Sequence, residues 1–378
     1  MKKAKRKSYL GRRRLGKKIR AGVIGVGNCF AGLVQGIEFY RQNPDKEVIG
    51  IMHHEIGGYK IYDIDFVSAF DVARNKVGKP LHVAVYKEPN KVNWIKLPKS
   101  KVTVKEAPAL DGIGLYVENL IDPIDNMDRA DELRAEIVKE IGRTKTQVLV
   151  NYLPVGSDKA TQFWVQVALD TGCAFVNCIP SFIASDKKWE KKFREAGLPV
   201  IGDDIKGQIG ATIVHRTLAR LSADRGAKIE RTYQLNVGGN TDFLNMKEQE
   251  RLQSKKVSKT ESVQSQLKER LPDNDIYVGP SDFIPFLGNN KLCFIRMEGR
   301  LFADIPFNLE LRLDVDDKAN SAGIVIDCVR FAQKALNDGK RGFQEISCFY
   351  MKHPLYQLSD SEAREVIEKE LTRTTKRY

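Results

Sequence analysis

The chain has 378 residues, more than the roughly 250–300 residues at which one hydrophobic core stops growing, so two domains are expected. Its composition, 42% hydrophobic and 29% charged, is typical of a globular protein. We find no signal peptide and no apolar run near the ~18 residues that span a bilayer, which argues against a secreted or membrane-spanning protein. The six scattered cysteines fit a reducing compartment, so a cytoplasmic location is expected.

The net charge of +13 comes mostly from the N-terminus. Residues 1–18 contain ten Lys or Arg residues and no acid, whereas the rest of the chain has 52 basic and 49 acidic residues. This segment has no apolar periodicity, and we expect a disordered basic tail. Contact with nucleic acid by charge alone is an alternative, but a solvated tail is the favoured interpretation.

The first predicted element is a buried parallel strand over residues 19–26, because this stretch is short, mostly apolar and rich in β-branched residues. Gly25 and Gly27 remove side chains where this strand turns into a helix over residues 31–40. This arrangement brings backbone N–H groups and a helix N-terminus to a pyrophosphate. Phe30 stands where the usual third glycine would be, so a simple tight turn is the alternative. The flanking strand and helix favour a dinucleotide site.

A second strand is predicted over residues 66–71, after an insertion that spans residues 43–65. It ends at Asp71, and an acid at this place accepts hydrogen bonds from an adenosine ribose. Such an acid favours NAD over NADP, although Arg74 weakens this inference. Asp71 could equally cap a helix that begins at Val72. The adjacent histidines of the insertion, His53 and His54, do not predict a metal site.

Strands and helices alternate through the next part of the chain. A short strand is expected at residues 102–104, and Ser157 is expected to cap a helix that runs to Asp170. The other predicted elements are helices over 130–141 and 186–196 and strands over 147–151, 174–178 and 199–204. The alternation predicts an α/β fold with a Rossmann-like, doubly wound parallel sheet, whose ligands bind beyond the carboxyl ends of the strands.

The pattern changes after Gln208. A helix over 211–223 precedes strands with alternating side chains, over 229–237, 292–298 and 307–315. Alternation predicts an antiparallel sheet with one covered face, and therefore an inserted α+β domain. A helix over 321–336, a segment over 346–352 and a polar helix over 359–370 follow. We expect a tail over 1–18, an NAD-binding domain over 19–205, a substrate and oligomerisation domain over 206–315, and a return to the first domain over 316–378.

Two stretches of the second domain hold more polar groups than folding requires. Gly238 and Gly239 lie between Asn236, Asn240 and Asp242, so backbone and side-chain amides could bind hydroxyls or phosphate oxygens. Further on, Lys255 and Lys259 are four residues apart and share one face if the segment is helical. A solvated charged face is the usual meaning of such lysines, whereas crowded lysines can bind phosphate or act as bases.

Together these stretches resemble the bacterial-type myo-inositol-1-phosphate synthases, also called inositol-3-phosphate synthases. The resemblance runs from about Ile19 to about Lys352. It is carried by residues 151–157, 182–186, 202–206, 236–240, 242–246, 254–260, 320–323 and 351–352. Gly207 departs from the family, since many members have a serine there, and so does the basic tail.

The resemblance implies that D-glucose 6-phosphate is converted to 1D-myo-inositol 3-phosphate with no net redox change. NAD oxidises C5, the C6 enolate attacks the C1 aldehyde, and the ring ketone is then reduced. An ordinary NAD-dependent sugar-phosphate dehydrogenase is the alternative, and a non-catalytic nucleic-acid binder is a more distant one. The resemblance also implies a homotetramer. A divalent cation occurs in part of the family, but no ligand cluster in the sequence predicts one here.

The residues of the site are carried over from the family by motif. Those matched to catalysis are Lys255, Lys259, Lys291, Lys352, Asp204, Asp242 and Asp317. Those expected at the cofactor are Gly25, Gly27, Asn28, Cys29, Asp71, Asn151, Pro154, Gly156, Ala184 and Asp204. Those expected at the substrate are Asn240, Lys206, Thr212 and Lys259. Lys259 and Asn240 are assigned to the phosphate, Lys291 and Lys255 to proton transfer and the C5 oxygen, and Lys352 to the developing oxyanion.

Overall fold

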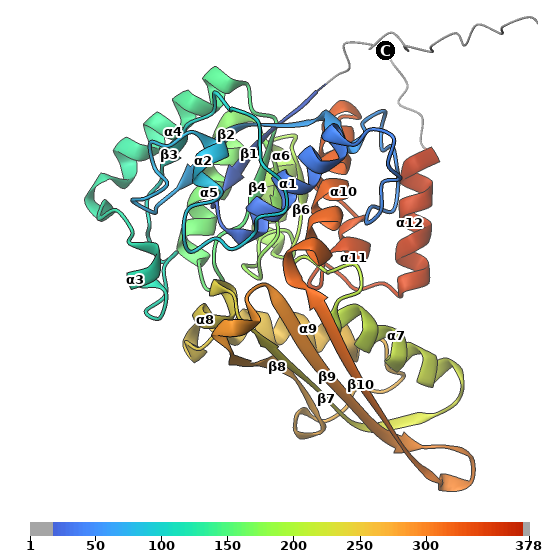
Figure 1. Cartoon of the computed structure of the whole chain (residues 1–378). Coiled ribbons are helices and arrows are strands. Elements are labelled where there is room, and N and C mark those ends of the chain that lie inside the picture. Colours follow the sequence, from blue (N-terminus) through green and yellow to red (C-terminus); the bar gives the residue numbers. More distant parts are fainter. Residues whose placement is uncertain (1–17, 373–378) are drawn as a thin grey trace, which may run out of the picture.

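A computed structural model describes residues 18–372 and shows two β-sheets, one above the other in the view of Figure 1. The predicted disordered tail lies outside the described residues except for Lys18. In the described part of the chain, no helix has the length and apolar character needed to cross a membrane.

The upper sheet has seven parallel strands in the order β11-β6-β5-β4-β1-β2-β3. The strands are β1 (Ile19–Ile24), β2 (Ile64–Asp71), β3 (Val104–Glu106), β4 (Val148–Asn151), β5 (Ala174–Asn177), β6 (Pro199–Ile201) and β11 (Gly342–Phe343). The chain proceeds outward from β1 to β3 and then from β4 to β6 on the other side. This order confirms the predicted doubly wound sheet and creates a crevice between the ends of β1 and β4.

Both faces of this sheet are buried because alternate strand residues enter two different hydrophobic clusters. In β4, Val148 and Val150 pack on one face and Leu149 packs on the other. The first face is covered by α1 (Asn28–Gln42), α10 (Asp317–Asn337), α11 (Ser347–Tyr350) and α12 (Asp360–Thr372). The second face is covered by α4 (Ala130–Thr144), α5 (Asp158–Thr171) and α6 (Lys187–Glu195). Two short helices, α2 (Leu81–Ala84) and α3 (Glu118–Ile121), lie in the segment between β2 and α4.

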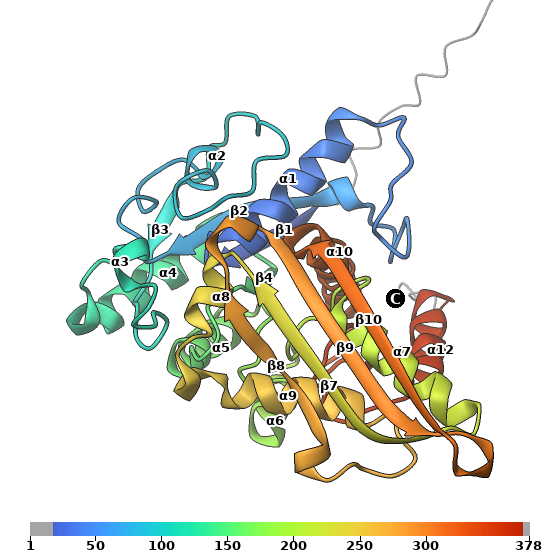
Figure 2. The same ribbon diagram turned by 60° about the horizontal axis from the view of Figure 1, so that its bottom comes forward.

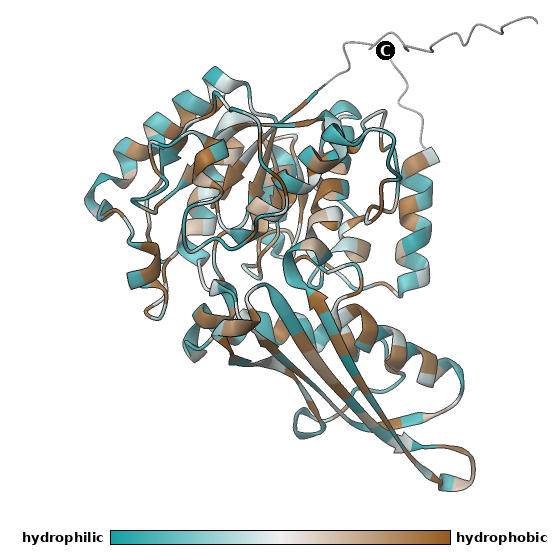
Figure 3. Cartoon of the chain, in the orientation of Figure 1, coloured by the Kyte–Doolittle hydropathy of each residue, from teal (hydrophilic) through white to brown (hydrophobic). Residues whose placement is uncertain are grey.

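The lower sheet has the strand order β10-β9-β7-β8, with β7 (Lys228–Gly238), β8 (Ile276–Phe283), β9 (Asn290–Arg300) and β10 (Pro306–Asp316). Helices α7 (Ala211–Asp224) and α9 (Gln253–Gln264) pack on one face through a cluster that includes Ala219, Val263 and Ile295. Figure 2 shows the opposite face without a covering helix. Polar and apolar residues alternate along β7, β9 and β10 (Figure 3), as one covered face requires.

The three predicted strands of this sheet pair antiparallel as expected, and a fourth strand, which was not predicted, pairs parallel. β9 pairs antiparallel with β7 and β10, but β8 pairs parallel with β7. The sequence analysis did not predict β8, because Gly279 and Pro280 interrupt its apolar pattern.

Two predicted helix caps are also corrected by the structure. No helix begins at Val72, because the chain after β2 forms turns and a bridge between Ala73 and Pro123. Ser157 precedes α5, but its hydroxyl donates to the Pro154 carbonyl instead of accepting from the helix. The Asp111 carboxylate accepts from the first-turn amides of α5, at 2.7 and 2.8 Å.

The C-terminal part of the chain returns to the end of β6. Residues 203–206 and 350–353 run antiparallel, with hydrogen bonds from Lys206 N to Tyr350 O (2.9 Å) and from Lys352 N to Asp204 O (2.7 Å). Asp204 has a left-handed backbone with φ of 61°, which redirects the chain after the buried Asp203. This short ladder carries Lys352 to the carboxyl edge of the parallel sheet.

Candidate active site

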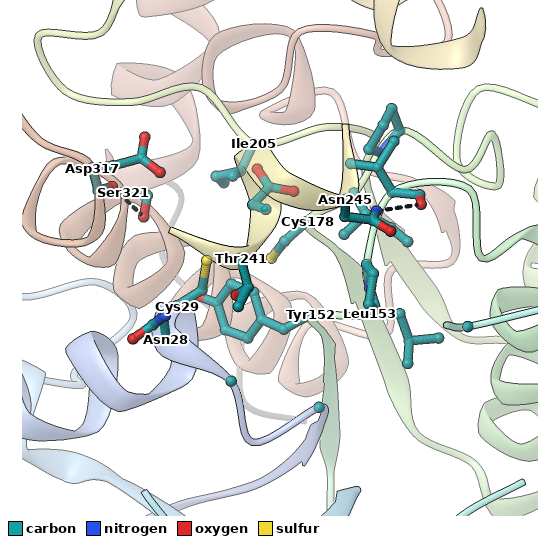
Figure 4. Close-up of a pocket in the computed structure, with 18 of the residues that line it drawn as sticks. Asn28, Cys29, Tyr152, Leu153, Cys178, Ile205, Thr241, Asn245, Asp317 and Ser321 are labelled. Carbon is teal, nitrogen blue, oxygen red and sulfur yellow. Dashed lines mark hydrogen bonds between the residues drawn. The ribbon is translucent and has the colours of Figure 1, made fainter. Parts of the chain in front are cut away.

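A cavity of about 250 Å³ opens at the carboxyl ends of β1 and β4, where the strand order of the parallel sheet reverses. In the close-up of Figure 4, Asn28 and Cys29 of α1 lie below Asp317 and Ser321 of α10, while Tyr152 enters from the end of β4. The second domain closes the cavity through α8 (Thr241–Asn245), α9 and the first residues of β9. The cavity therefore lies between the two sheets.

The lining carries more positive than negative charge. Six lysines line it, namely Lys76, Lys255, Lys259, Lys291, Lys318 and Lys352. Four aspartates line it as well, namely Asp71, Asp204, Asp242 and Asp317. Counted with every lysine protonated, the lining has a formal excess of two positive charges in a partly desolvated space, which favours an anionic ligand.

The turn after β1 brings backbone groups to the cavity. Gly25 has a left-handed φ of 89°, and a Cβ added there would lie 2.9 Å from the Tyr152 carbonyl oxygen, so only glycine fits without strain. Gly27 is the N-cap of α1, and an added Cβ would meet no atom within 4 Å. No side chain of the described residues caps α1, so its first-turn amides stay available to an anion.

Asp71 fixes this turn. Its carboxylate accepts from the backbone N–H of Val26 at 2.7 Å and from those of Val72 and Ala73 at 2.8 Å. Asp71 thus joins the end of β2 to the end of β1 and lines the cavity beside the glycine turn.

Two polar groups in this wall have no partner among the described residues. Asn28 anchors itself through Oδ1, which accepts from Lys91 N at 2.6 Å, while its buried Nδ2 has no hydrogen bond. The buried Tyr152 hydroxyl likewise has no partner. An unpaired buried donor costs about 1–3 kcal/mol, which a bound ligand can recover. Uncapped helix amides, an open glycine and unpaired donors fit a dinucleotide.

The lysines come from three different parts of the chain. Lys255 and Lys259 lie one turn apart on the buried face of α9, Lys291 is the second residue of β9, and Lys352 follows α11. Each of three lysines has a carboxylate beside it. The N···O distances are 3.2 Å for Lys255 and Asp242, 3.6 Å for Lys291 and Asp317, and 2.7 Å for Lys352 and Asp204.

Lys259 differs from the other three because its ammonium makes no ion pair within the described part of the chain. Burial and the neighbouring ammonium groups of Lys291, Lys255 and Lys352 hold its pKa well below the ordinary value. Burial alone would also lower the pKa of Lys255, but Asp242 and Asp204 outweigh it and raise that pKa. Lys259 is therefore the cation that a bound anion would stabilise most.

Asp204 connects the two domains at this site. Its carboxylate accepts from Lys352 Nζ and from the Ser258 hydroxyl of α9, both at 2.7 Å. Burial alone would raise the pKa of Asp204, but Lys352 and Lys255 lower it below its ordinary value. The neighbouring Asp203 accepts from the amides of Ile183, Ala184 and Ser185, and burial raises its pKa to about 6.

Most of the predicted site residues line the same cavity. They are Gly25, Gly27, Asn28, Cys29, Asp71, Pro154, Asp204, Thr212, Asp242, Lys255, Lys259, Lys291, Asp317 and Lys352.

Five predicted residues do not line the cavity. Lys206 is buried behind it and donates to the Cys348 carbonyl at 2.9 Å. Asn240 caps α8 and donates to Asp317 at 3.3 Å, so it acts on a lining residue. The Asn151 side chain donates a hydrogen bond to Asn177, and the backbone N–H of Ala184 donates one to Asp203. Gly156 packs on the side chain of Arg251. These residues support the wall without facing a ligand.

Two lining lysines were not predicted. Lys76 donates to the Val26 carbonyl at 3.0 Å and to Asn90 at 3.2 Å, and so supports the glycine turn. Lys318 follows Asp317 at the start of α10. Its position beside a carboxylate already matched to the family was an available signal.

A divalent cation is implied only by the resemblance to part of the family, and no motif of this sequence predicts one. Within residues 18–372, no group of three or more His, Cys, Asp or Glu side chains is placed to hold a metal ion.

Comparison with known proteins gives consistent matches along the chain. A family model described as myo-inositol-1-phosphate synthase matches residues 210–318. The chain is 46% identical to proteins named inositol-3-phosphate synthase from Mycolicibacterium smegmatis and Corynebacterium glutamicum, over 93% of this chain and 97% of each of those proteins. A solved myo-inositol-1-phosphate synthase-related protein from Thermotoga maritima aligns with a TM-score of 0.81 and 26% identity, over 95% of this chain and 100% of that one.

Proposed function

Because the chain belongs to the myo-inositol-1-phosphate synthase family, we propose that it is an inositol-3-phosphate synthase, which converts D-glucose 6-phosphate to 1D-myo-inositol 3-phosphate. One observation carries this proposal. The glycine turn of the parallel sheet and four lysines from distant segments line a single cavity. A dinucleotide and a sugar phosphate can therefore lie side by side there.

NAD is the proposed cofactor, and when bound it supplies the acceptor for the hydride from C5 and later returns that hydride to the same carbon. The chain would hold it through the first-turn amides of α1, the open face of Gly27 and the unpaired Asn28 Nδ2. Asp71 is the proposed partner of the adenosine ribose and also keeps the turn in place.

Lys259 is the proposed phosphate ligand. Among Lys255, Lys259, Lys291 and Lys352 it is the one whose ammonium has no ion pair with a described residue, and a phosphate dianion would supply the missing negative charge. Thr212 lines the same cavity and offers a hydroxyl.

Lys255 and Lys291 are proposed to act at the C5 oxygen. The raised pKa of Lys255 keeps it cationic, which suits stabilisation of a developing negative charge. Lys291, as a neutral amine beside Asp317, is then the group that takes the hydroxyl proton when the C5 ketone forms. The ketone acidifies C6, and transfer of a C6 proton to the dianionic phosphate of the substrate gives the enolate.

Lys352 is proposed to stabilise the oxygen of C1. When the C6–C1 bond forms, the aldehyde oxygen becomes an alkoxide and needs a cation and a proton. Lys352 can supply both, because Asp204 holds its ammonium at 2.7 Å. Asp242 and Asp317 are proposed to orient Lys255 and Lys291 in the same way.

We also propose a cytoplasmic homotetramer. All six cysteines are free thiols, which suits a reducing compartment. The uncovered face of the lower sheet exposes Tyr233, Tyr277 and Phe294, and is the proposed subunit contact. Light scattering of the purified protein would give its mass in solution.

The test of the function is product identification by NMR after incubation with glucose 6-phosphate and NAD. We expect an inositol phosphate without accumulation of NADH. A steady rise in NADH absorbance with an open-chain product would instead establish the conventional dehydrogenase.

A further inference from the structure

Lys318 is a buried cation that the proposed reaction does not use. It lies in the first turn of α10, it is 2% exposed, and it lines the cavity. Burying an ammonium costs several kcal/mol unless partners compensate, so its neighbours indicate what it faces.

The neighbours of Lys318 place it between the start of α1, where the dinucleotide is proposed to bind, and Asp317, which pairs with Lys291. Its Nζ lies 2.9 Å from Asp317 Oδ2 and 3.5 Å from the sulfur of Cys29, in the first turn of α1. Its Cβ would be 3.2 Å from a Cβ added at Gly32, so α1 and α10 are in close contact here. The ammonium therefore lies beside the anion-binding end of α1.

The charge of Lys318 is only partly balanced. Asp317 is shared, because its other oxygen lies 3.6 Å from Lys291 Nζ. A thiol is a weak acceptor, and an ammonium has three N–H donors, so Lys318 keeps hydrogen-bonding capacity for an oxygen anion. Burial alone would lower its pKa, but Asp317 outweighs burial and raises the pKa above its ordinary value, so the group stays protonated.

We propose that Lys318 binds the diphosphate of the dinucleotide, adding a side-chain cation to the backbone amides of α1. The inference rests on the proposed NAD site and names a residue for one part of that ligand. Asp317 contacts both lysines, so it connects Lys318, proposed at the diphosphate, with Lys291, proposed at the sugar.

The test compares two ligands that differ in the diphosphate. Calorimetry would measure binding of ADP-ribose and of adenosine to the full-length wild type, Lys318→Met and Lys318→Arg. We expect Lys318→Met to weaken ADP-ribose binding roughly 10- to 100-fold, as for a hydrogen bond to a charged group, and adenosine binding less than about 2-fold. Lys318→Arg should stay within about 5-fold, and the salt dependence of ADP-ribose binding should decrease in Lys318→Met.

A matched control is Lys334→Met, which removes another buried lysine of α10 that pairs with Asp338 and does not line the cavity. It should leave both affinities unchanged, whereas an equal loss in this variant would show a general effect of disturbing α10. Equal losses for adenosine and ADP-ribose in Lys318→Met, or no loss, would overturn the proposal. If the wild type binds neither ligand, it is the proposed NAD site that fails.

Should Lys318→Met not fold, as judged by thermal unfolding, a crystal structure of the wild type with ADP-ribose decides the question. A distance from Lys318 Nζ to the nearest diphosphate oxygen within hydrogen-bond range supports the proposal. A distance beyond about 5 Å contradicts it.

Discussion

The two walls of the cavity present different chemical groups. The wall on the parallel sheet offers backbone amides, held by the left-handed turn at Gly25 and by the carboxylate of Asp71. The wall from α9 and β9 offers ammonium groups held beside carboxylates, such as Lys255 beside Asp242. Backbone amides do not titrate, whereas lysine charges depend on their neighbours. We therefore expect pH and substitutions of charged residues to affect activity mainly through the second wall. Substitutions that change the size of a side chain should affect it mainly through the first wall.

The largest effect should follow from removing Lys259. Lys259→Met deletes the buried cation proposed to hold the phosphate, and we expect kcat/KM to fall about 1000-fold or more. The rate of product formation would be followed by phosphorus NMR. Lys256→Met, an exposed lysine of the same helix, should stay within about 3-fold of the wild type. Comparable losses in the two variants would contradict the distinction between them.

Asp204→Asn should have the next largest effect, with a loss of about 100-fold in kcat/KM. The Asp204 carboxylate raises the pKa of Lys352 against the effect of burial, so its removal lets that pKa fall further. Lys352 then loses its proton at lower pH, and the alkaline limb of the pH–rate profile should move to lower pH. Ser258→Ala removes a neutral partner of Asp204 and should lower activity less, without moving this limb. An unchanged alkaline limb in Asp204→Asn would show that Lys352 is not the titrating group.

Two glycine substitutions test the first wall. Gly25→Ala places a Cβ on a left-handed residue and against the Tyr152 carbonyl, so it should lower the free energy of unfolding by roughly 1–3 kcal/mol. Gly27→Ala adds a Cβ that meets no protein atom, so stability should change by less than about 0.5 kcal/mol. NAD binding should nevertheless weaken about 10-fold, because the methyl group faces the cavity. Denaturant unfolding and calorimetry measure the two effects, and normal NAD affinity in Gly27→Ala would place the cofactor elsewhere.

The smallest effect is expected outside the cavity. His215 of α7 is fully buried against β7 and bonds to Thr232 at 2.8 Å and Gln234 at 3.3 Å. Burial lowers its pKa from 6.5 to about 4, so the unfolded state binds a proton that the folded state does not. Stability from this group is present above pH 6.5 and is lost as the pH falls toward 4, and the loss is already about 1 kcal/mol near pH 6. Denaturant unfolding of the wild type and His215→Gln should show this acid-dependent difference, and parallel pH curves would contradict it.

The parallel sheet could be predicted from sequence because it depends on local patterns. Short apolar runs, such as the one before Gly25, indicate strands, glycines after them indicate turns, and the helical periodicity that follows indicates helices. The lower sheet was predicted less well, since the pairing direction of β8 depends on contacts with β7 that are distant in sequence.

The site was predictable in its members but not in its geometry. The motifs named Lys255, Lys259 and Asp204, but no spacing in the sequence shows that Asp204 lies between Lys352 and Ser258. Lys206 belongs to one of those motifs and nevertheless points away from the cavity, because the left-handed backbone at Asp204 turns the chain. A family motif thus identifies segments that lie near the cavity, whereas the direction of each side chain depends on the local backbone.

The antiparallel ladder between residues 203–206 and 350–353 has a consequence for biosynthesis. The glycine turn precedes Lys352 by more than 300 residues, so it is made well before Lys352 on the ribosome. A nascent chain can form β1 to β6 and still lack the cation opposite Asp204. The cavity therefore has this cation only after residue 352 has been made, and a product terminated before that residue would lack it even with β1 to β6 folded.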